Sequence, residues 1–168
     1  AKEAELIQTY IAQGVSGIAI APLSQDASIP NLKEASGKGI KVAVLDTGFE
    51  LSHPDFVGRN ITAAPFITGE TAQDGHGHGT HCIGTALGRK CPPQSRPRYG
   101  VAHLGEVYAG KVLSNAGSGS DTGILAGIEW AIANKCAVVS MSLGAPTQPG
   151  QPFSQIYERV ALRAQAKG

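Results

Sequence analysis

The sequence is short of aromatic residues, of unbalanced charge and of long apolar runs, and these shortages exclude several classes of protein. Phe, Trp and Tyr make up 5% of the 168 residues, and 14 basic residues nearly balance 13 acidic ones, for a net charge of +1. Without a basic stripe or a charged tail, electrostatics give no reason to expect nucleic-acid or membrane partners. No apolar run approaches the roughly 20 residues of a membrane span. The charged start AKEAELIQTY lacks the apolar stretch of a signal peptide.

Cysteine is also scarce, since the chain has only Cys82, Cys91 and Cys136. Three cysteines cannot all pair within one chain. Cys82 lies in the apolar run CIGTALG, which predicts a buried free thiol. Cys91 and Cys136 are either joined by a disulfide or reduced, and their spacing does not distinguish these two states.

Glycine, by contrast, is abundant at 22 residues, as expected where tight βα corners repeat. Short apolar runs and helical spacing of apolar residues predict a chain of alternating strands and helices. The predicted strands are 15–21, 40–45, 107–111 and 137–143, and the predicted helices are 2–13, 26–36, 78–88, 121–134 and 153–167. We therefore expect a single α/β domain over residues 1–168, with a doubly wound parallel sheet of about five strands and helices on both faces.

Three segments place chemically active residues at the ends of predicted elements. In VAVLDTG, an apolar strand delivers Asp46 at its carboxyl end, where doubly wound sheets collect reacting groups. In DGHGHGTH, the histidine spacing does not match the HEXXH zinc pattern, and His78 opens a helix where a carboxylate can orient its ring. The third segment, SMSLG, leaves a strand. Taken alone, the first segment is more typical of an Asp that caps a turn, and the third is consistent with a core strand.

Together, VAVLDTG, SHPDF, GHGTHCIGTALG, GIEWAIANK and VVSMSLG resemble the subtilisin-like serine proteases over residues 38–168, and HGTHC is similar to the proteinase K branch. The resemblance implies a serine endopeptidase acting on a peptide or protein substrate. It implies that Asp46 orients His78, which acts as general base and then as general acid. It also implies a secreted or extracytoplasmic location.

The resemblance further implies two walls of a substrate site. One wall is Gly117, Ser118 and Gly119, which would pair with an extended peptide, and the other is Ser142, Leu143 and Gly144, at the S1 pocket. Asp74 would border the S2 subsite. His76 would be exposed at the rim of the site, and His81 would be structural and partly buried.

Asp55, in SHPDF, matches a carboxylate that binds calcium in many members of this family. There, the remaining ligands come from a loop that here reads RKCPPQSRPRYG, which is basic and lacks Asn and Asp. Asp55 is therefore a weak calcium candidate, and no cofactor is expected.

The chain departs from the family pattern at both ends. No segment with the oxyanion Asn or the G-T-S-M-A nucleophile is present, so we expect this chain alone to be inactive and a C-terminal protease fragment to be its complementing partner. Residues 1–37, above all IAQGVSGIAIAPLS, resemble the helix–strand–helix unit of periplasmic sugar-binding proteins. The chain is either a natural piece with an unusual front or an engineered or recombined chimera, and we prefer the chimera.

Two other functions remain open at this stage. The front unit, with Pro22–Ser24 at a strand end, is consistent with part of a sugar-binding module, although an isolated half-site buries little ligand. A folded α/β scaffold without activity is the second alternative.

Overall fold

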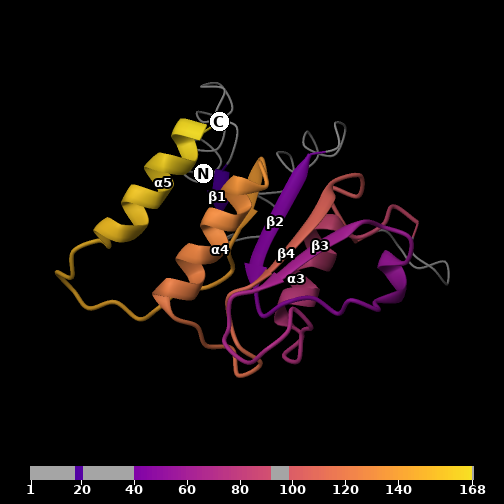
Figure 1. Cartoon of the computed structure of the whole chain (residues 1–168), viewed down its shortest axis with the longest axis horizontal. Helices are drawn as coiled ribbons and strands as arrows, with labels where there is room; N and C mark the ends of the chain where they lie inside the picture. Colours follow the sequence, from indigo (N-terminus) through magenta and orange to yellow (C-terminus); the bar gives the residue numbers. More distant parts are fainter. Residues whose placement is uncertain (1–17, 21–39, 92–98, 168) are drawn as a thin grey trace.

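A five-stranded parallel sheet forms the centre of the molecule (Figure 1). The computed structural model describes residues 18–20, 40–91 and 99–167. The strand order is β1–β5–β2–β4–β3, and every pairing between neighbours is parallel. The strands are β1 Ile18–Ile20, β2 Lys41–Asp46, β3 Ile61–Pro65, β4 Glu106–Lys111 and β5 Val138–Ser140. The helices are η1 Pro54–Phe56, α3 His78–Leu87, α4 Asp121–Ala133 and α5 Gln155–Lys167.

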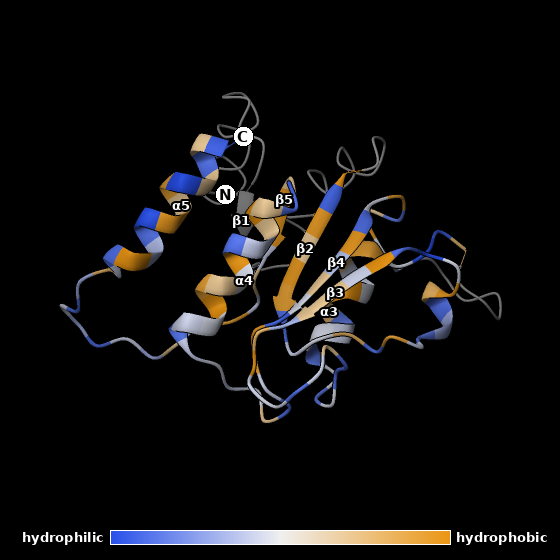
Figure 2. Ribbon diagram, viewed as in Figure 1, coloured by the Kyte–Doolittle hydropathy of each residue, from blue (hydrophilic) through white to orange (hydrophobic). Residues whose placement is uncertain are grey.

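Strand β2 is buried on both faces, which explains why its sequence is an unbroken apolar run. Val42 and Val44 belong to the cluster that includes residues of α3, whereas Ala43 and Leu45 belong to clusters that include residues of α4. In Figure 2 the strand is orange along most of its length. Helices α3 and α4 therefore cover opposite faces of the sheet, which confirms the predicted doubly wound α/β architecture.

Strand β3 is the element that the sequence pattern does not predict. Its residues, ITAAP, are half-buried or exposed, and the strand pairs with β4 alone at the edge of the sheet. The run ends in Pro65, a residue that sheets tolerate at edges because it lacks an N–H donor. A strand with weak apolar character and no regular alternation gives little signal in the sequence.

The described part of the front segment is strand β1, which lies within the predicted strand 15–21. It pairs with β5, with Ile18 opposite Val138. The front segment thus contributes to the same sheet as the rest of the chain. The predicted helices 2–13 and 26–36 and the segment Pro22–Ser24 lie outside the described residues, so the chimera and the partial sugar site stay predictions.

Helix α5 packs against α4. Val160 is buried, and the Tyr157 hydroxyl donates a hydrogen bond to Asp121 Oδ1 at 2.9 Å. Burial, together with this contact to Asp121, raises the pKa of Tyr157 to about 12. Arg163 and Glu129 form an ion pair between the same two helices. None of the described helices is both long and apolar enough to cross a membrane.

The three cysteines are all free thiols, so the Cys91–Cys136 bridge is not formed. Cys82 is free as predicted, but it is only half-buried, at the border of the buried face of α3, where it packs against the core cluster. Burial raises the pKa of the Cys82 thiol, and burial raises the pKa of Cys136 to about 12. Cys91 is exposed.

These differences predict unequal reactivity of the thiols. We expect iodoacetamide at about pH 8 to alkylate Cys91 first, because the attacking species is the thiolate and Cys82 and Cys136 are held as shielded thiols. Mass spectrometry of tryptic peptides over time measures the three rates. Cys91→Ser should remove the fast phase, and equal rates at all three positions would contradict the structure.

Candidate active site

Asp46 and His78 meet where β2 ends and α3 begins. His78 Nδ1 lies 2.7 Å from Asp46 Oδ1, and the Thr47 N–H donates to the same oxygen at 2.7 Å. The Asp46 side chain is 1% exposed and that of His78 is 44% exposed. With Nδ1 held by the carboxylate, Nε2 is the ring nitrogen left to exchange a proton with a reacting group. The predicted proximity of the two residues is confirmed.

Glycines bring the start of α3 against the turn that follows β2. A Cβ atom on Gly79 would lie 2.3 Å from the Gly48 carbonyl oxygen, so a side chain at this position has no room. Gly77, at the N-cap of α3, has a left-handed backbone with φ of 98°. The Gly79 N–H donates to Thr47 Oγ1 at 2.9 Å. These contacts fix the position from which the His78 side chain reaches Asp46.

The buried carboxylate of Asp74 organises the segment around His78. Its Oδ1 accepts hydrogen bonds from the Thr47 hydroxyl and from the N–H groups of His76 and Gly77, each at 2.9 Å. Its Oδ2 accepts both the N–H and the hydroxyl of Thr80. Burial alone would raise the pKa of Asp74, but these hydrogen bonds outweigh it and hold that pKa well below the usual range. The carboxylate is thus occupied inside the protein, and its S2 assignment stays a prediction.

The two segments expected to bind substrate lie on either side of the strand that carries Asp46. Residues 117–119 follow β4 and residues 142–144 follow β5, and β2 lies between these two strands. The first segment is exposed, and a hydrogen bond of 2.7 Å from the Ser114 N–H to the Ser118 carbonyl closes a turn that includes its first two residues. In the second, Ser142 and Leu143 are partly buried and Gly144 is exposed. Their role in binding remains a prediction.

The remaining histidines differ in how well the sequence predicts them. His76 is exposed, as expected, and a Cβ atom on Gly117 would lie 3.2 Å from its Nε2. The expectation of a partly buried His81 is wrong, because this side chain is exposed. The buried face of α3 is formed instead by other residues, namely Gly79, Ile83, Gly84, Ala86 and Leu87.

Comparison with known proteins adds the decisive observation to this geometry. A family model described as the subtilase family matches residues 37–168, which is most of the chain. The chain belongs to the subtilase family. Subtilisin E of Bacillus subtilis is 46% identical over 114 residues, covering 67% of this chain and 29% of its own length. The cuticle-degrading protease of Metarhizium anisopliae is 44% identical over 118 residues, covering 66% of this chain and 28% of its own length.

A further relative covers more of the chain. Subtilisin-like protease 1 of Trichophyton rubrum is 37% identical over 141 residues, covering 80% of this chain and 25% of its own length. This subtilase chain thus spans less than a third of the length of these curated relatives.

One group of side chains in the described part of this subtilase has ligand atoms close enough to hold a metal ion. Atoms of Asp46, His78 and Cys82 all lie within 4.8 Å of one another. Asp46 and His78 are already joined at 2.7 Å, a hydrogen-bond distance that leaves no room for an ion between them. Asp46 Oδ2 is buried without a hydrogen-bond partner among the described residues, which is a costly state for a carboxylate oxygen.

The described contacts of Asp55 are with Tyr99 and His53, and its weak calcium candidacy stays a prediction. Asp55 is 6% exposed, its Oδ2 accepts a hydrogen bond from the Tyr99 hydroxyl, and His53 Nδ1 accepts the Asp55 N–H. Calcium requires about six to eight oxygen ligands. Within the described residues, no group of three acidic, histidine or cysteine side chains includes Asp55. Residues 92–98 of the loop that supplies calcium ligands elsewhere in the family lie outside the described residues.

A pocket of about 500 Å³ lies away from the Asp46–His78 pair. Its lining residues, which include Arg59, Arg89, His103 and Glu106, surround the amino end of β4, whereas Asp46 lies at the carboxyl end of β2. In doubly wound sheets, ligands bind at the carboxyl ends of the strands. We therefore place the candidate site at Asp46 rather than in this pocket.

Sequence reasoning missed three polar residues close to this pair, namely Glu70, Lys111 and Asn115. The available signal was a lysine at the end of an otherwise apolar strand, VYAGK, one strand away from Asp46. Glu70 and Asn115 lie in loops, and nothing in their spacing indicates that they meet.

Proposed function

We propose that this chain carries the Asp–His part of a serine endopeptidase site that hydrolyses peptide bonds in a peptide or protein substrate. The observation that carries the proposal is the contact of 2.7 Å between His78 Nδ1 and Asp46 Oδ1, in a chain of the subtilase family. By the same family membership, the proposed location is extracytoplasmic.

In the proposed reaction, Asp46 keeps the His78 ring in the tautomer that carries its proton on Nδ1. His78 Nε2 then takes the proton of a serine hydroxyl as the serine oxygen forms a bond to the scissile carbonyl carbon. The same nitrogen passes that proton to the leaving amine when the C–N bond breaks, and a water molecule later releases the acyl group by the same route. Asp46 stabilises the imidazolium at each stage and stays ionised.

The serine and the oxyanion donor are assigned to a segment outside residues 1–168. Among the described residues, the recorded side-chain contacts of the His78 ring are with Asp46, Cys82 and His76, and none is a hydroxyl. We therefore propose a complementing C-terminal protease fragment as the partner and expect no hydrolysis by this chain alone.

The proposed substrate contacts are the two segments beside β2. An extended peptide would pair with Gly117–Gly119 as an added strand, and Ser142–Gly144 would face it from the opposite side. Asp74 would act at the S2 subsite through the backbone that it holds.

The test is reconstitution with the C-terminal part of subtilisin E, beginning after the region that matches this chain. We expect the mixture to hydrolyse a chromogenic peptide, whereas each polypeptide alone does not. Size-exclusion chromatography establishes whether the two associate. Association without hydrolysis would contradict the proposed endopeptidase site and favour a scaffold without activity.

A further inference from the structure

Lys111, the last residue of β4, is a fully buried lysine next to the candidate site. Its side chain is 0% exposed, and its register partner in β2 is Asp46. Lysine is almost never fully buried unless its charge is paired and its N–H donors are satisfied. The partners of this ammonium therefore show what it does in the fold.

The three N–H donors of the Lys111 ammonium meet three acceptors from three different segments. Nζ donates to the Thr47 carbonyl oxygen, directly after Asp46, and to Asn115 Oδ1 at 2.8 Å. It pairs with Glu70 Oε2 at 3.2 Å. Because an ammonium has three donors and no acceptor, this set satisfies it completely.

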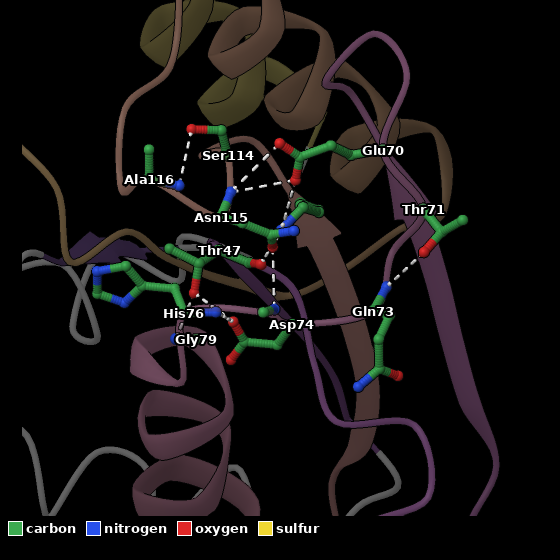
Figure 3. A network of polar contacts seen from close by, with 12 residues as sticks. Thr47, Glu70, Thr71, Gln73, Asp74, His76, Gly79, Ser114, Asn115 and Ala116 are labelled. Carbon is green, nitrogen blue, oxygen red and sulfur yellow. Dashed lines mark hydrogen bonds and ion pairs between the residues drawn. The ribbon is translucent and has the colours of Figure 1, made fainter.

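Asn115 extends the contact to the segment that carries His78. Its Oδ1 also accepts the Gly75 N–H at 2.9 Å, and its own N–H donates to Glu70 Oε2 at 3.1 Å. Figure 3 shows Asn115 between Glu70 on one side and Thr47 and Asp74 on the other, close to the first turn of α3. A Cβ atom on Gly75 would lie 2.6 Å from Asn115 Cγ, so the Asn115 side chain lies directly against the Gly75 backbone, where a larger residue has no room.

Asn115 also lies inside the turn 114–118, which contains the first two residues of the proposed peptide edge. Ser114 and Ser118 close this turn through the Ser118 carbonyl, and the Gly117 N–H donates to the Ser114 carbonyl at 2.9 Å. Fixing Asn115 therefore fixes the orientation of residues 117–119 relative to the Asp46 turn and to Gly75.

We propose that Lys111 is a positioning residue of the peptidase site. Its ammonium holds Asn115, and through Asn115 it sets the peptide-binding edge 117–119 against the loop that leads to His78. This assignment rests on the proposed function, because it gives the edge a substrate to bind. Lys111 touches no reacting atom and acts only through the loop that it orients.

The sharpest variant is Asn115→Ala. Asn115 is exposed, so the fold is expected to survive, while the bridge from Lys111 to Gly75 is lost. The probe is N-acetyl-tetra-alanine amide, titrated into the labelled full chain and followed by NMR through the amide signals of Gly117 and Gly119. We expect the dissociation constant to rise about tenfold and the chain to stay folded, with a thermal unfolding midpoint lower by a few degrees because the buried Lys111 ammonium loses one of its three acceptors.

The second variant is Lys111→Met combined with Glu70→Gln, which removes the ammonium without leaving Glu70 as an unpaired charge. We expect the same loss of peptide affinity. The matched control is Lys41→Met. Lys41 is the first residue of β2, at the end of the strand opposite Asp46, and its Nζ donates to the Asn134 carbonyl. Lys41→Met should bind the probe as the wild type does.

Wild-type affinity in both Asn115→Ala and the double variant would overturn the positioning role. If the wild type itself does not bind the probe, the proposed peptide edge fails instead. In that case the Gly75 and Gly117 amide signals still test Lys111: they should shift in both variants and not in Lys41→Met, and unchanged signals would overturn the assignment.

Discussion

Replacing His78 by alanine is expected to lower kcat of the reconstituted protease by about six orders of magnitude, the effect known for the corresponding residue of subtilisin. The imidazole is the only proposed group that moves the serine proton, and no other base is hydrogen-bonded to Asp46 among the described residues. Asp46→Asn should cost about four orders of magnitude, because an amide no longer holds the proton on Nδ1. Initial rates of chromogenic-peptide hydrolysis measure both effects.

The control for these variants is His81→Ala. His81 lies three residues further along α3 with an exposed side chain, so its loss should leave kcat nearly unchanged. Activity that survives in His78→Ala, or that is lost equally in His81→Ala, would show that the Asp46–His78 contact is not the proton-transferring pair.

Replacing Asp74 by asparagine is expected to lower the free energy of unfolding by about 3 kcal/mol. The carboxylate accepts hydrogen bonds from two hydroxyls and three backbone N–H groups, and an amide presents a donor to part of this set. The start of α3 would lose the contacts that hold it against the turn after β2. Urea denaturation measures the loss.

The same residue predicts a dependence of stability on pH. The pKa of Asp74 is lowered in the folded protein, so its stabilising effect is complete above the ordinary Asp value of about 4 and declines as pH falls through the folded value. Wild-type stability should therefore fall on acidification more steeply than that of Asp74→Asn. Glu158→Gln, at an exposed carboxylate of α5, is the control and should keep the wild-type slope. Parallel slopes in all three proteins would contradict the assignment.

The sequence predicts those parts of the fold and of the candidate site for which one local sequence pattern is sufficient. The apolar run of β2 requires burial on both faces, and a carboxylate at its end lies at the reactive edge of such a sheet. The order of the motifs, which resembles that of the subtilases, then predicts that His78 lies at the same edge. Strand β3 could not be predicted from its apolar pattern, because edge strands need little apolar character.

The polar residues around the site could not be predicted for a different reason. Glu70 and Asn115 are 45 positions apart, and they meet only because two loops converge above Lys111. The exposure of His81 could not be predicted either, because it also depends on tertiary packing. The helix pattern locates α3, but the rotation that gives the sheet-facing positions to Ile83 and Leu87 is decided by tertiary packing.

The pairing of β1 with β5 has a consequence for the way the chain reaches its folded state. Ile18 lies opposite Val138, so this contact closes a loop of 120 residues, whereas the other strands of the sheet are joined over shorter separations. Long loops are entropically costly to close before other contacts have formed, so β1 is expected to dock late. Until it does, the outer edge of β5 presents unpaired N–H and C=O groups, and a nascent chain is open to pairing with a strand of another molecule at that edge.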